Sequence, residues 1–185
     1  MSASSTPVEA EQGRLNTMVG AEPAVFARLL PLIKGVWAEN VVHVGGPGAG
    51  HTVKLLNNML AMNQCVATAE AFAVGVKAGI DPKKLVEVVS LGGVNSGMFQ
   101  NVSMALHGDL DKGKFELDNA RKDLRYYTHL AESVNVPSPH GDVVLSGLAT
   151  ASALGHGKKF VNALVLAQEQ LNGIKIVGAP QPPPA

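Results

Sequence analysis

The first fifty residues alternate between short apolar stretches and turn residues, a pattern that predicts strand, helix and strand in succession. Residues 14–20 and 40–45 are the strand candidates, since they are rich in apolar and β-branched side chains and each ends in glycine. Residues 22–37 place apolar side chains at helical spacing, with Pro23 in the first turn, where the missing N–H is not needed. Pro31 is expected to kink this helix or to begin a second turn.

From residue 47 onward, every predicted element is a helix. The longest begins at Gly50 or His51 and stops at Gly79, a residue suited to end a helix. At about 1.5 Å per residue this helix is about 45 Å long. The next helix has Asp81 as its N-cap and Pro82 at its first position. Further helices are predicted near residues 96–107, 115–135, 139–154 and 158–172.

This order of elements predicts a mostly α fold, in which an all-helical domain on a long central helix follows a short α/β segment. We expect residues 1–46 to form the strand–helix–strand part and residues 47–176 to form the helical domain. Residues 177–185 are expected to form an extended or disordered proline-rich tail. The α/β part is too short to be a complete doubly wound sheet.

Composition and charge argue against several classes of partner. Of the 185 residues, 46% are hydrophobic and 16% are charged, as in a globular protein with a substantial core. Fifteen basic and fifteen acidic residues give no net charge, and aromatic residues make up only 4%, so neither nucleic acid nor an anionic membrane is an expected partner. Polar residues inside the longest helix, such as Lys54 and Glu70, make it too polar for a membrane span.

Cysteine usage and the N-terminal sequence favour a cytoplasmic location. Cys65 is the only cysteine, so the chain has no internal disulfide and suits a reducing compartment. Its position in the middle of a helix predicts a small buried hydrophobic residue. The first thirteen residues lack a basic segment followed by an apolar run, and therefore do not resemble a secretory signal.

The first turns of the longest helix carry the candidate chemistry. Lys54 and Asn58 are four residues apart, so they share one face just after a glycine-rich turn. Asparagine is a poor helix former, by roughly 0.5–0.7 kcal/mol relative to alanine, so Asn57 and Asn58 in succession indicate polar groups that face a cleft. Partial burial near the positive end of the helix dipole would lower the pKa of Lys54 and suit it to proton transfer. The alternative is an ordinary surface lysine beside capping-type asparagines, and residue types and spacing alone favour neither interpretation.

The remaining polar residues indicate no other chemistry. The six histidines form no H-x-x-H, H-x-x-x-H or H-E-x-x-H motif, so no metal site is predicted. No serine lies in a G-x-S-x-G setting, which argues against serine hydrolysis. Asn95 and Ser96 are expected to cap the helix that follows them.

Several collinear segments, covering roughly residues 6–172, resemble the 3-hydroxyisobutyrate dehydrogenase family of β-hydroxyacid dehydrogenases, relatives of 6-phosphogluconate dehydrogenase. The segments are GRLNTMVGAEPAVFARLLPLIKGVW at residues 13–37, HVGGPGAGHTVKLLNN at 43–58, AEAFAVGVKAGIDPKKLVEVVSLGG at 69–93 and GKFELDNARKDLRYYTHLAESVNVPSP at 113–139. The last contains the K-D-L segment of the family.

The resemblance implies an oxidoreductase that interconverts a small 3-hydroxy acid and its aldehyde or ketone with NAD or NADP. It implies that Lys54 is the catalytic acid and base, that Asn58 and Gly50 bind substrate, and that Lys122 contacts the cofactor. The α/β segment would be the end of a Rossmann-type nucleotide domain. The helical domain would carry catalysis and assembly into a homodimer or tetramer. A lysine at position 54 argues against relatives such as imine reductases.

Three departures from the family concern its nucleotide and substrate sites. No G-x-G-x-x-G loop lies near the N-terminus, so we expect the dinucleotide-binding half to be lacking and the chain alone to be inactive. EAEQG at residues 9–13 stands where the family has S-G-G, and Phe160 stands where it tends to have aspartate. The alternative function is therefore a non-catalytic helical module for dimerisation or assembly, derived from the same family.

Self-association is expected in either case. The longest helix is apolar nearly all round and needs cover on every side. Ala67, Ala71 and Gly75 are four residues apart and form a small-residue seam that another helix can approach closely. That helix could belong to the same chain or to a second copy.

Overall fold

The computed structural model describes residues 2–3, 10–111 and 113–178. The chain forms two compact units, residues 1–58 and residues 59–185, each described by itself below. The division falls inside one long helix, α3 (Ala49–Lys77), which the sequence predicted from Gly50 or His51 onward. The proline-rich tail from residue 179 and the stretch at residues 4–9 lie outside the described residues.

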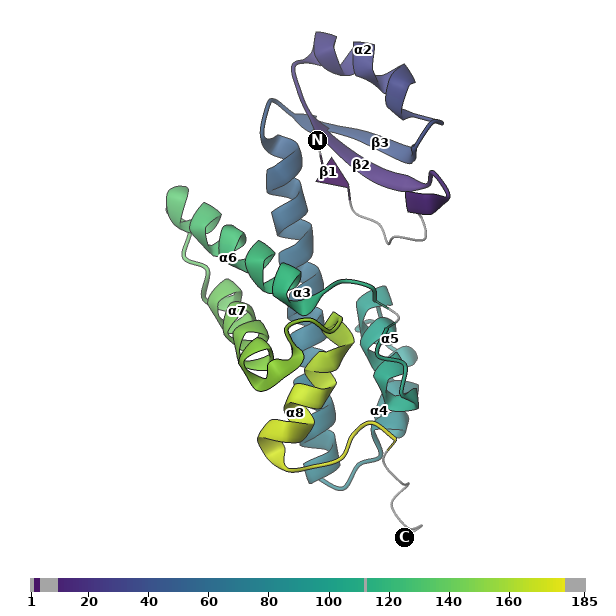
Figure 1. Ribbon diagram of the computed structural model, residues 1–185, viewed down its shortest axis with the longest axis vertical. Helices are drawn as coiled ribbons and strands as arrows, with labels where there is room; N and C mark the ends of the chain where they lie inside the picture. Colours follow the sequence, from purple (N-terminus) through teal and green to yellow (C-terminus); the bar gives the residue numbers. More distant parts are fainter. Residues whose placement is uncertain (1, 4–9, 112, 179–185) are drawn as a thin grey trace. The chain divides into compact units, whose positions relative to one another are not determined.

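The first unit is a small sheet with one covering helix. Strand β2 lies between β1 and β3, antiparallel to β1 and parallel to β3, so that Thr17 is paired with Val41. A parallel pair needs a crossover, and helix α2 supplies it (Figure 1). The elements are β1 (Ser2–Ala3), β2 (Leu15–Gly20), α2 (Pro23–Ile33) and β3 (Ala38–Gly45).

Helix α2 packs on one face of this sheet. Val19, Ile33 and Ala38 form its buried centre, and the ring of Phe26 stacks on that of His43 with centroids 4.5 Å apart. Pro31 lies inside α2, but the helix ends at Ile33 rather than at residue 37 as predicted. The chain turns there because Lys34 is extended and Gly35 has a φ of 78°, a conformation that favours glycine.

The end of β2 meets the first turn of α3 backbone to backbone. A Cβ atom on Gly20 would lie 2.5 Å from the carbonyl oxygen of Gly46, and a Cβ atom on Gly50 would lie 2.7 Å from that of Met18. Real Cβ atoms do not approach backbone oxygens so closely, so only glycine fits at either position. This contact fixes where α3 begins and how it leaves the sheet.

Among the described residues of the second unit, the regular elements are all helices, apart from an isolated bridge between Glu116 and Phe160. Figure 1 shows α6 and α7 on one side of α3 and α4 and α5 on the other. After α3 the elements are α4 (Pro82–Ser90), α5 (Gly97–Ser103), a 3-10 turn (Met104–His107), α6 (Leu117–Ser133), α7 (Pro139–Ala151), a π turn (Ser152–His156), a 3-10 turn (Val161–Ala163) and α8 (Leu164–Asn172).

Three predicted helix ends, at Gly79, Asp81 and Ser96, are confirmed, whereas α8 begins at Leu164 rather than near residue 158. Asp81 accepts a hydrogen bond from the Lys83 backbone N–H at 2.8 Å, and Ser96 accepts one from Phe99 at 3.1 Å. Gly79 has a φ of 79° and follows the last turn of α3. These boundaries are therefore specified by local capping interactions.

The core of the second unit surrounds α3. Met62, Cys65 and Phe72 face inward and pack against residues of α5, α6, α7 and α8. Burial raises the pKa of the Cys65 thiol to about 12, because the thiolate would lose its hydration. The prediction that Cys65 is a buried hydrophobic residue is therefore confirmed, and its thiol is not a nucleophile at neutral pH.

Among the described residues, one helix is long and apolar enough to cross a membrane by length and composition alone, and it is α3. We expected the polar residues of α3 to make it too polar for a membrane span. By length and composition alone, they do not exclude one. The core helix of a soluble protein meets the same criterion. From Met62 to Phe72, α3 supplies side chains to the core of the second unit.

The glycine contact generates the first prediction. Gly50→Ala should lower the free energy of unfolding of the first unit by about 1–3 kcal/mol, because a backbone oxygen cannot move away as a side chain can. Urea unfolding followed by fluorescence is a suitable measurement, because Trp37 is the only tryptophan and packs against the core of this unit.

Gly46→Ala is the matched control. No atom lies within 4 Å of a Cβ placed on Gly46, so this variant should stay within about 0.5 kcal/mol of the wild type. Equal losses in the two variants would show that the Gly50 contact is not what stabilises the unit.

Candidate functional site

The turn before α3 is built from glycines in unusual conformations. Gly45 has a φ of 124° and Gly48 a φ of 94°, both favoured only by glycine. The N–H of Ala49 donates to the Gly46 carbonyl at 3.1 Å, and the N–H of His51 donates to the Gly48 carbonyl at 3.0 Å. Both of these backbone N–H groups are therefore bonded within the turn.

Lys54 and Asn58 lie four residues apart on the first part of α3, within the first unit. Lys54 is half-buried and Asn58 is 5% exposed, and neither side chain is without an interaction partner. Their common face was predicted from the spacing alone. The structure adds that α3 is anchored one turn earlier, at Gly50, so the direction of this face is fixed relative to the sheet. The structure shows that Gly50 itself packs against the backbone of β2.

The paired asparagines have different environments. Asn58 is buried, whereas Asn57 is exposed and donates from its side-chain nitrogen to the side-chain oxygen of Asn58 at 3.4 Å. An amide whose oxygen accepts this bond keeps its nitrogen for other partners. Asn57 therefore helps to orient Asn58, a role that the sequence interpretation did not assign.

Lys122 lies on α6, within the second unit. Its side chain is 45% exposed, and its Nζ lies 3.3 Å from Oδ1 of Asp123, the next residue of the K-D-L segment. Asp123 is only 16% exposed, so this carboxylate is more enclosed than the lysine that it faces. That Lys122 serves one site with Lys54 and Asn58 stays a prediction.

A polar cluster at the start of α6 was missed by the sequence interpretation. Asp118 accepts a hydrogen bond from the Ser152 hydroxyl at 2.7 Å, and Arg121 and Lys158 each lie 3.7 Å from one of its oxygens. Gly157 lies against the same carboxylate, since a Cβ there would be 2.6 Å from Oδ2. Except for Arg121, these residues are 34 or more positions from Asp118 in the sequence. No sequence spacing therefore indicates the cluster.

Backbone pairing holds the same turn in place. The Leu117 N–H donates to the Lys159 carbonyl at 2.9 Å, and the Val161 N–H donates to the Phe115 carbonyl at 2.9 Å. Phe160, which stands where the resembled family tends to have aspartate, lies between these two bonds and is half-buried. The turn before α8 is thereby joined to the start of α6.

Two groups of this cluster have shifted pKa values. The Ser152 hydroxyl donates to the Asp118 carboxylate and, with Arg121 and Lys158, holds the pKa of Asp118 below its usual range. The hydrogen bond to Glu116 raises the pKa of Lys158. Both groups are therefore charged at neutral pH.

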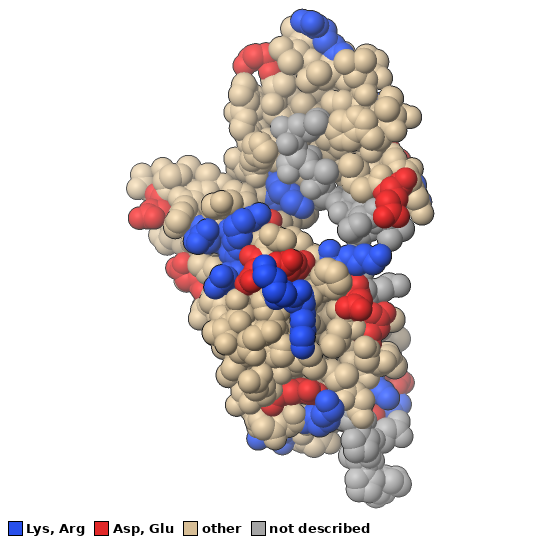
Figure 2. All heavy atoms as spheres, in the orientation of Figure 1, with Lys and Arg blue, Asp and Glu red and all other residues tan. Residues whose placement is uncertain are grey.

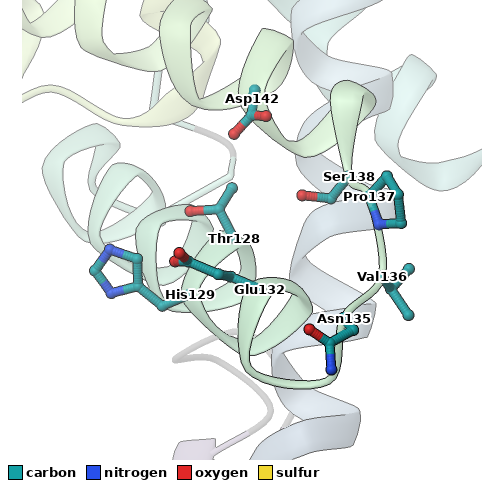
Figure 3. A pocket seen from close by; sticks show the side chains of 8 residues that line it. All are labelled: Thr128, His129, Glu132, Asn135, Val136, Pro137, Ser138 and Asp142. Atoms are coloured by element: carbon teal, nitrogen blue, oxygen red, sulfur yellow. The ribbon is translucent and has the colours of Figure 1, made fainter.

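A polar hollow of about 520 Å³ lies where α6 turns into α7. Figure 3 shows the hydroxyl of Ser138 and the carboxylates of Glu132 and Asp142 around it. None of the predicted site residues lines this hollow. Across residues 2–3, 10–111 and 113–178, no group of three or more His, Cys, Asp or Glu side chains could hold a metal ion.

Comparison with known sequences places these features in a family. Residues 48–167 match the profile described as "NAD-binding of NADP-dependent 3-hydroxyisobutyrate dehydrogenase". The chain is 32% identical to 2-(hydroxymethyl)glutarate dehydrogenase from Eubacterium barkeri, over 91% of this chain and 56% of that protein. It is also 32% identical to L-threonate dehydrogenase from Escherichia coli K12, over 93% of this chain and 56% of that protein. The chain thus spans little more than half the length of these relatives.

Solved structures show the same fold. A 3-hydroxyisobutyrate dehydrogenase from Salmonella typhimurium, 32% identical, superposes with a TM-score of 0.77 over 89% of this chain and 57% of that one. A 3-hydroxyisobutyrate dehydrogenase from Mycobacterium tuberculosis, solved with L-serine, has a TM-score of 0.80 over 89% of this chain and 58% of that one. At 24% identity, the second comparison shows the fold alone.

The Asp118 cluster generates a pH prediction. Because the folded pKa of Asp118 lies below its unfolded value of about 3.9, the cluster stabilises the fold above about pH 4, and that stability is lost as the pH falls through the folded pKa. Ser152→Ala removes the largest cause of the shift. The pKa of Asp118 should rise in this variant, as measured by NMR titration of its carboxyl carbon.

Ser146→Ala is the control, because the exposed Ser146 lies on α7, the helix that precedes Ser152, and outside this cluster. It should leave the titration of Asp118 unchanged. A pKa of Asp118 that does not move in Ser152→Ala would contradict the assigned role of the hydroxyl.

Proposed function

The chain belongs to the 3-hydroxyisobutyrate dehydrogenase family, and from this membership we propose that it carries the catalytic lysine of an NAD(P)-dependent dehydrogenase acting on a small 3-hydroxy acid. The observation that supports this most is Lys54 with Asn58 on one face of α3, directly after the glycine anchor. Both residues lie within the stretch that matches the family. Relatives named for 2-(hydroxymethyl)glutarate and L-threonate indicate the substrate class, a hydroxylated carboxylic acid.

In the proposed mechanism, Lys54 moves the proton of the substrate hydroxyl. Its half-buried amine takes this proton during oxidation and returns it to the carbonyl oxygen during reduction. The buried amide of Asn58 holds the same oxygen in position, and Asn57 orients that amide. When bound, the nicotinamide cofactor would accept the hydride during oxidation and donate it during reduction.

The cofactor fits this chain only in part. Lys122 is the proposed contact to it, as a half-exposed cation beside a more enclosed carboxylate. The pyrophosphate needs a glycine-rich turn whose backbone N–H groups are open, at a helix N-terminus beside a strand. The turn before α3 uses the N–H groups of Ala49 and His51 internally, and no G-x-G-x-x-G occurs in the 185 residues. We therefore propose that the pyrophosphate is bound by residues other than these.

A second candidate function is assembly through the helical unit. Leu60 and Val74 of α3 are 69% and 62% exposed, and Ala67 and Ala71 between them are also exposed. Gly75, the last residue of the predicted seam, instead lies against Leu85 of the same chain. A groove of about 670 Å³ between α3 and α8 continues this surface, with Leu171 53% exposed at its edge. We propose that this surface is covered in a homodimer or tetramer. We also propose that the protein is located in the cytoplasm.

Catalysis is tested in a protein that includes a dinucleotide-binding half. Joining this chain to the preceding part of the Eubacterium barkeri relative should give oxidation of a 3-hydroxy acid with NAD or NADP. Lys54→Ala should then lower kcat by about 10²- to 10⁴-fold, the usual contribution of a general acid or base. The cofactor dissociation constant should change much less, because the amine acts on the substrate proton.

Lys83→Ala, which removes an exposed lysine of α4, is the control and should keep full activity. Calorimetric titration of the 185-residue chain alone with each cofactor should show no micromolar binding. A chimera that is folded and binds cofactor, but is inactive with Lys54 intact, would refute the catalytic proposal.

Assembly is tested by sedimentation equilibrium at low micromolar concentration. The wild type should sediment above the 19.2 kDa of one chain, and Val74→Glu/Leu171→Glu should shift it toward monomer, because charges would be buried at the interface. Val88→Glu/Leu91→Glu, on residues of α4 and its end that are 66% and 88% exposed, should leave assembly unchanged. A single monomeric species of the wild type would overturn this proposal.

A further inference from the structure

A second hollow, of about 300 Å³, lies between α6 and α7 and is rimmed by cations. Asp118, Arg121, Lys122 and Arg125 line it from α6, and Leu145 and Ala149 line it from α7. Figure 2 shows lysine and arginine side chains gathered around a few carboxylates over this part of the second unit. We call the hollow the α6–α7 groove.

The cations of this groove are incompletely balanced by carboxylates. Among the described residues, Arg125 forms no ion pair, and its guanidinium carbon lies 5.9 Å from the ring centre of Tyr126. Arg121 lies 3.7 Å from Asp118, a long contact to a carboxylate that already accepts from Ser152 and faces Lys158. Asp118, the acid that lines the groove, is therefore engaged by Ser152 and Lys158 and only at long range by Arg121. Among the described residues, the guanidinium of Arg125 has no carboxylate partner and keeps its hydrogen-bond donors available.

The spacing of the arginines suits one bound anion. Arg121 and Arg125 are four residues apart on α6, so their side chains leave the helix on the same face, about 5–6 Å apart at Cβ. Each guanidinium presents a planar pair of donors that matches two oxygens of a carboxylate or phosphate. The apolar floor of Leu145 and Ala149 excludes water from one side and strengthens the attraction.

We propose that the α6–α7 groove binds a small oxyanion ligand with at least two negative charges, through Arg121 and Arg125 and with Lys122 at its rim. A single carboxylate would neutralise one guanidinium and leave the other, whereas a phosphate or polycarboxylate satisfies both. This binding site goes beyond the proposed dehydrogenase activity and shares only Lys122 with it. Binding can be measured on the chain itself, without cofactor or turnover.

The test is an NMR titration of the ¹⁵N-labelled chain with inorganic phosphate and, separately, with citrate, in a buffer of low ionic strength. At least one probe should bind saturably with a dissociation constant at or below about 1 mM and shift the signals of α6 and of the arginine side chains. Stronger binding of citrate would identify the ligand as a polycarboxylate, and stronger binding of phosphate as a phosphorylated compound.

Arg121→Gln/Arg125→Gln should weaken this binding at least about tenfold, because both forked donors are lost. Both side chains are exposed, and thermal unfolding would verify that the variant is folded. Ala149→Glu, which places a carboxylate in the groove, should abolish binding through a different helix. Arg28→Gln/Lys83→Gln removes the same charge elsewhere and should leave binding intact.

Three results would overturn the proposal. They are the absence of saturable binding of either probe to the wild type, unchanged binding in Arg121→Gln/Arg125→Gln, and equal weakening in the Arg28→Gln/Lys83→Gln control. Loss of dehydrogenase activity in the chimera would not affect any of these results, so the two proposals fail separately.

Discussion

The close approach of the β2 backbone to the first turn of α3 is the constraint on which the placement of the candidate site depends. Two glycines, Gly20 and Gly50, meet there with no room for a side chain. Because packed backbone atoms do not yield as flexible side chains do, the helix start is held to the sheet with little freedom. Lys54 lies one turn and Asn58 two turns beyond Gly50, so a shift of this contact would move both residues together.

From this anchor, α3 continues as the centre of the second unit. Its inward face carries Met62, Cys65 and Phe72 into the core, and its outward face leaves Leu60 and Val74 exposed. One helix therefore serves a polar site in its first turns, a packed core along its middle and an uncovered apolar strip on its other side. This division explains why its sequence is apolar nearly all round and still interrupted by asparagine and lysine.

The start of α6 is organised by charge rather than by apolar packing alone. Asp118 joins Ser152, Arg121 and Lys158, and the backbone of residues 157–161 pairs with that of residues 115–118. The cluster holds the turn before α8 at the start of α6 and divides the Asp118 carboxylate among Ser152, Arg121 and Lys158. As a result, Asp118 balances Arg121 only in part, and Arg125, one turn further along α6, forms no ion pair among the described residues. Structural ion pairing at one end of the helix thus sets the electrostatics of the groove beside it.

The sequence by itself determined the features that depend on neighbours within one or two turns. Helical spacing gave the extent of α3 and the shared face of Lys54 and Asn58, and capping chemistry gave the ends at Gly79, Asp81 and Ser96. Family motifs added the fold and the dehydrogenase relationship, which the comparisons confirm.

Tertiary structure alone decided what depends on residues far apart in the chain. The Gly20–Gly50 contact, the Ser152 and Lys158 partners of Asp118 and the α6–α7 groove each join segments that no periodicity connects. It also decided which seam residues are covered, leaving Ala67 and Ala71 exposed and placing Gly75 against Leu85. Hydrogen-bond spacing and capping act along one segment of backbone, whereas close packing and ion pairing require the folded chain to bring distant segments into contact.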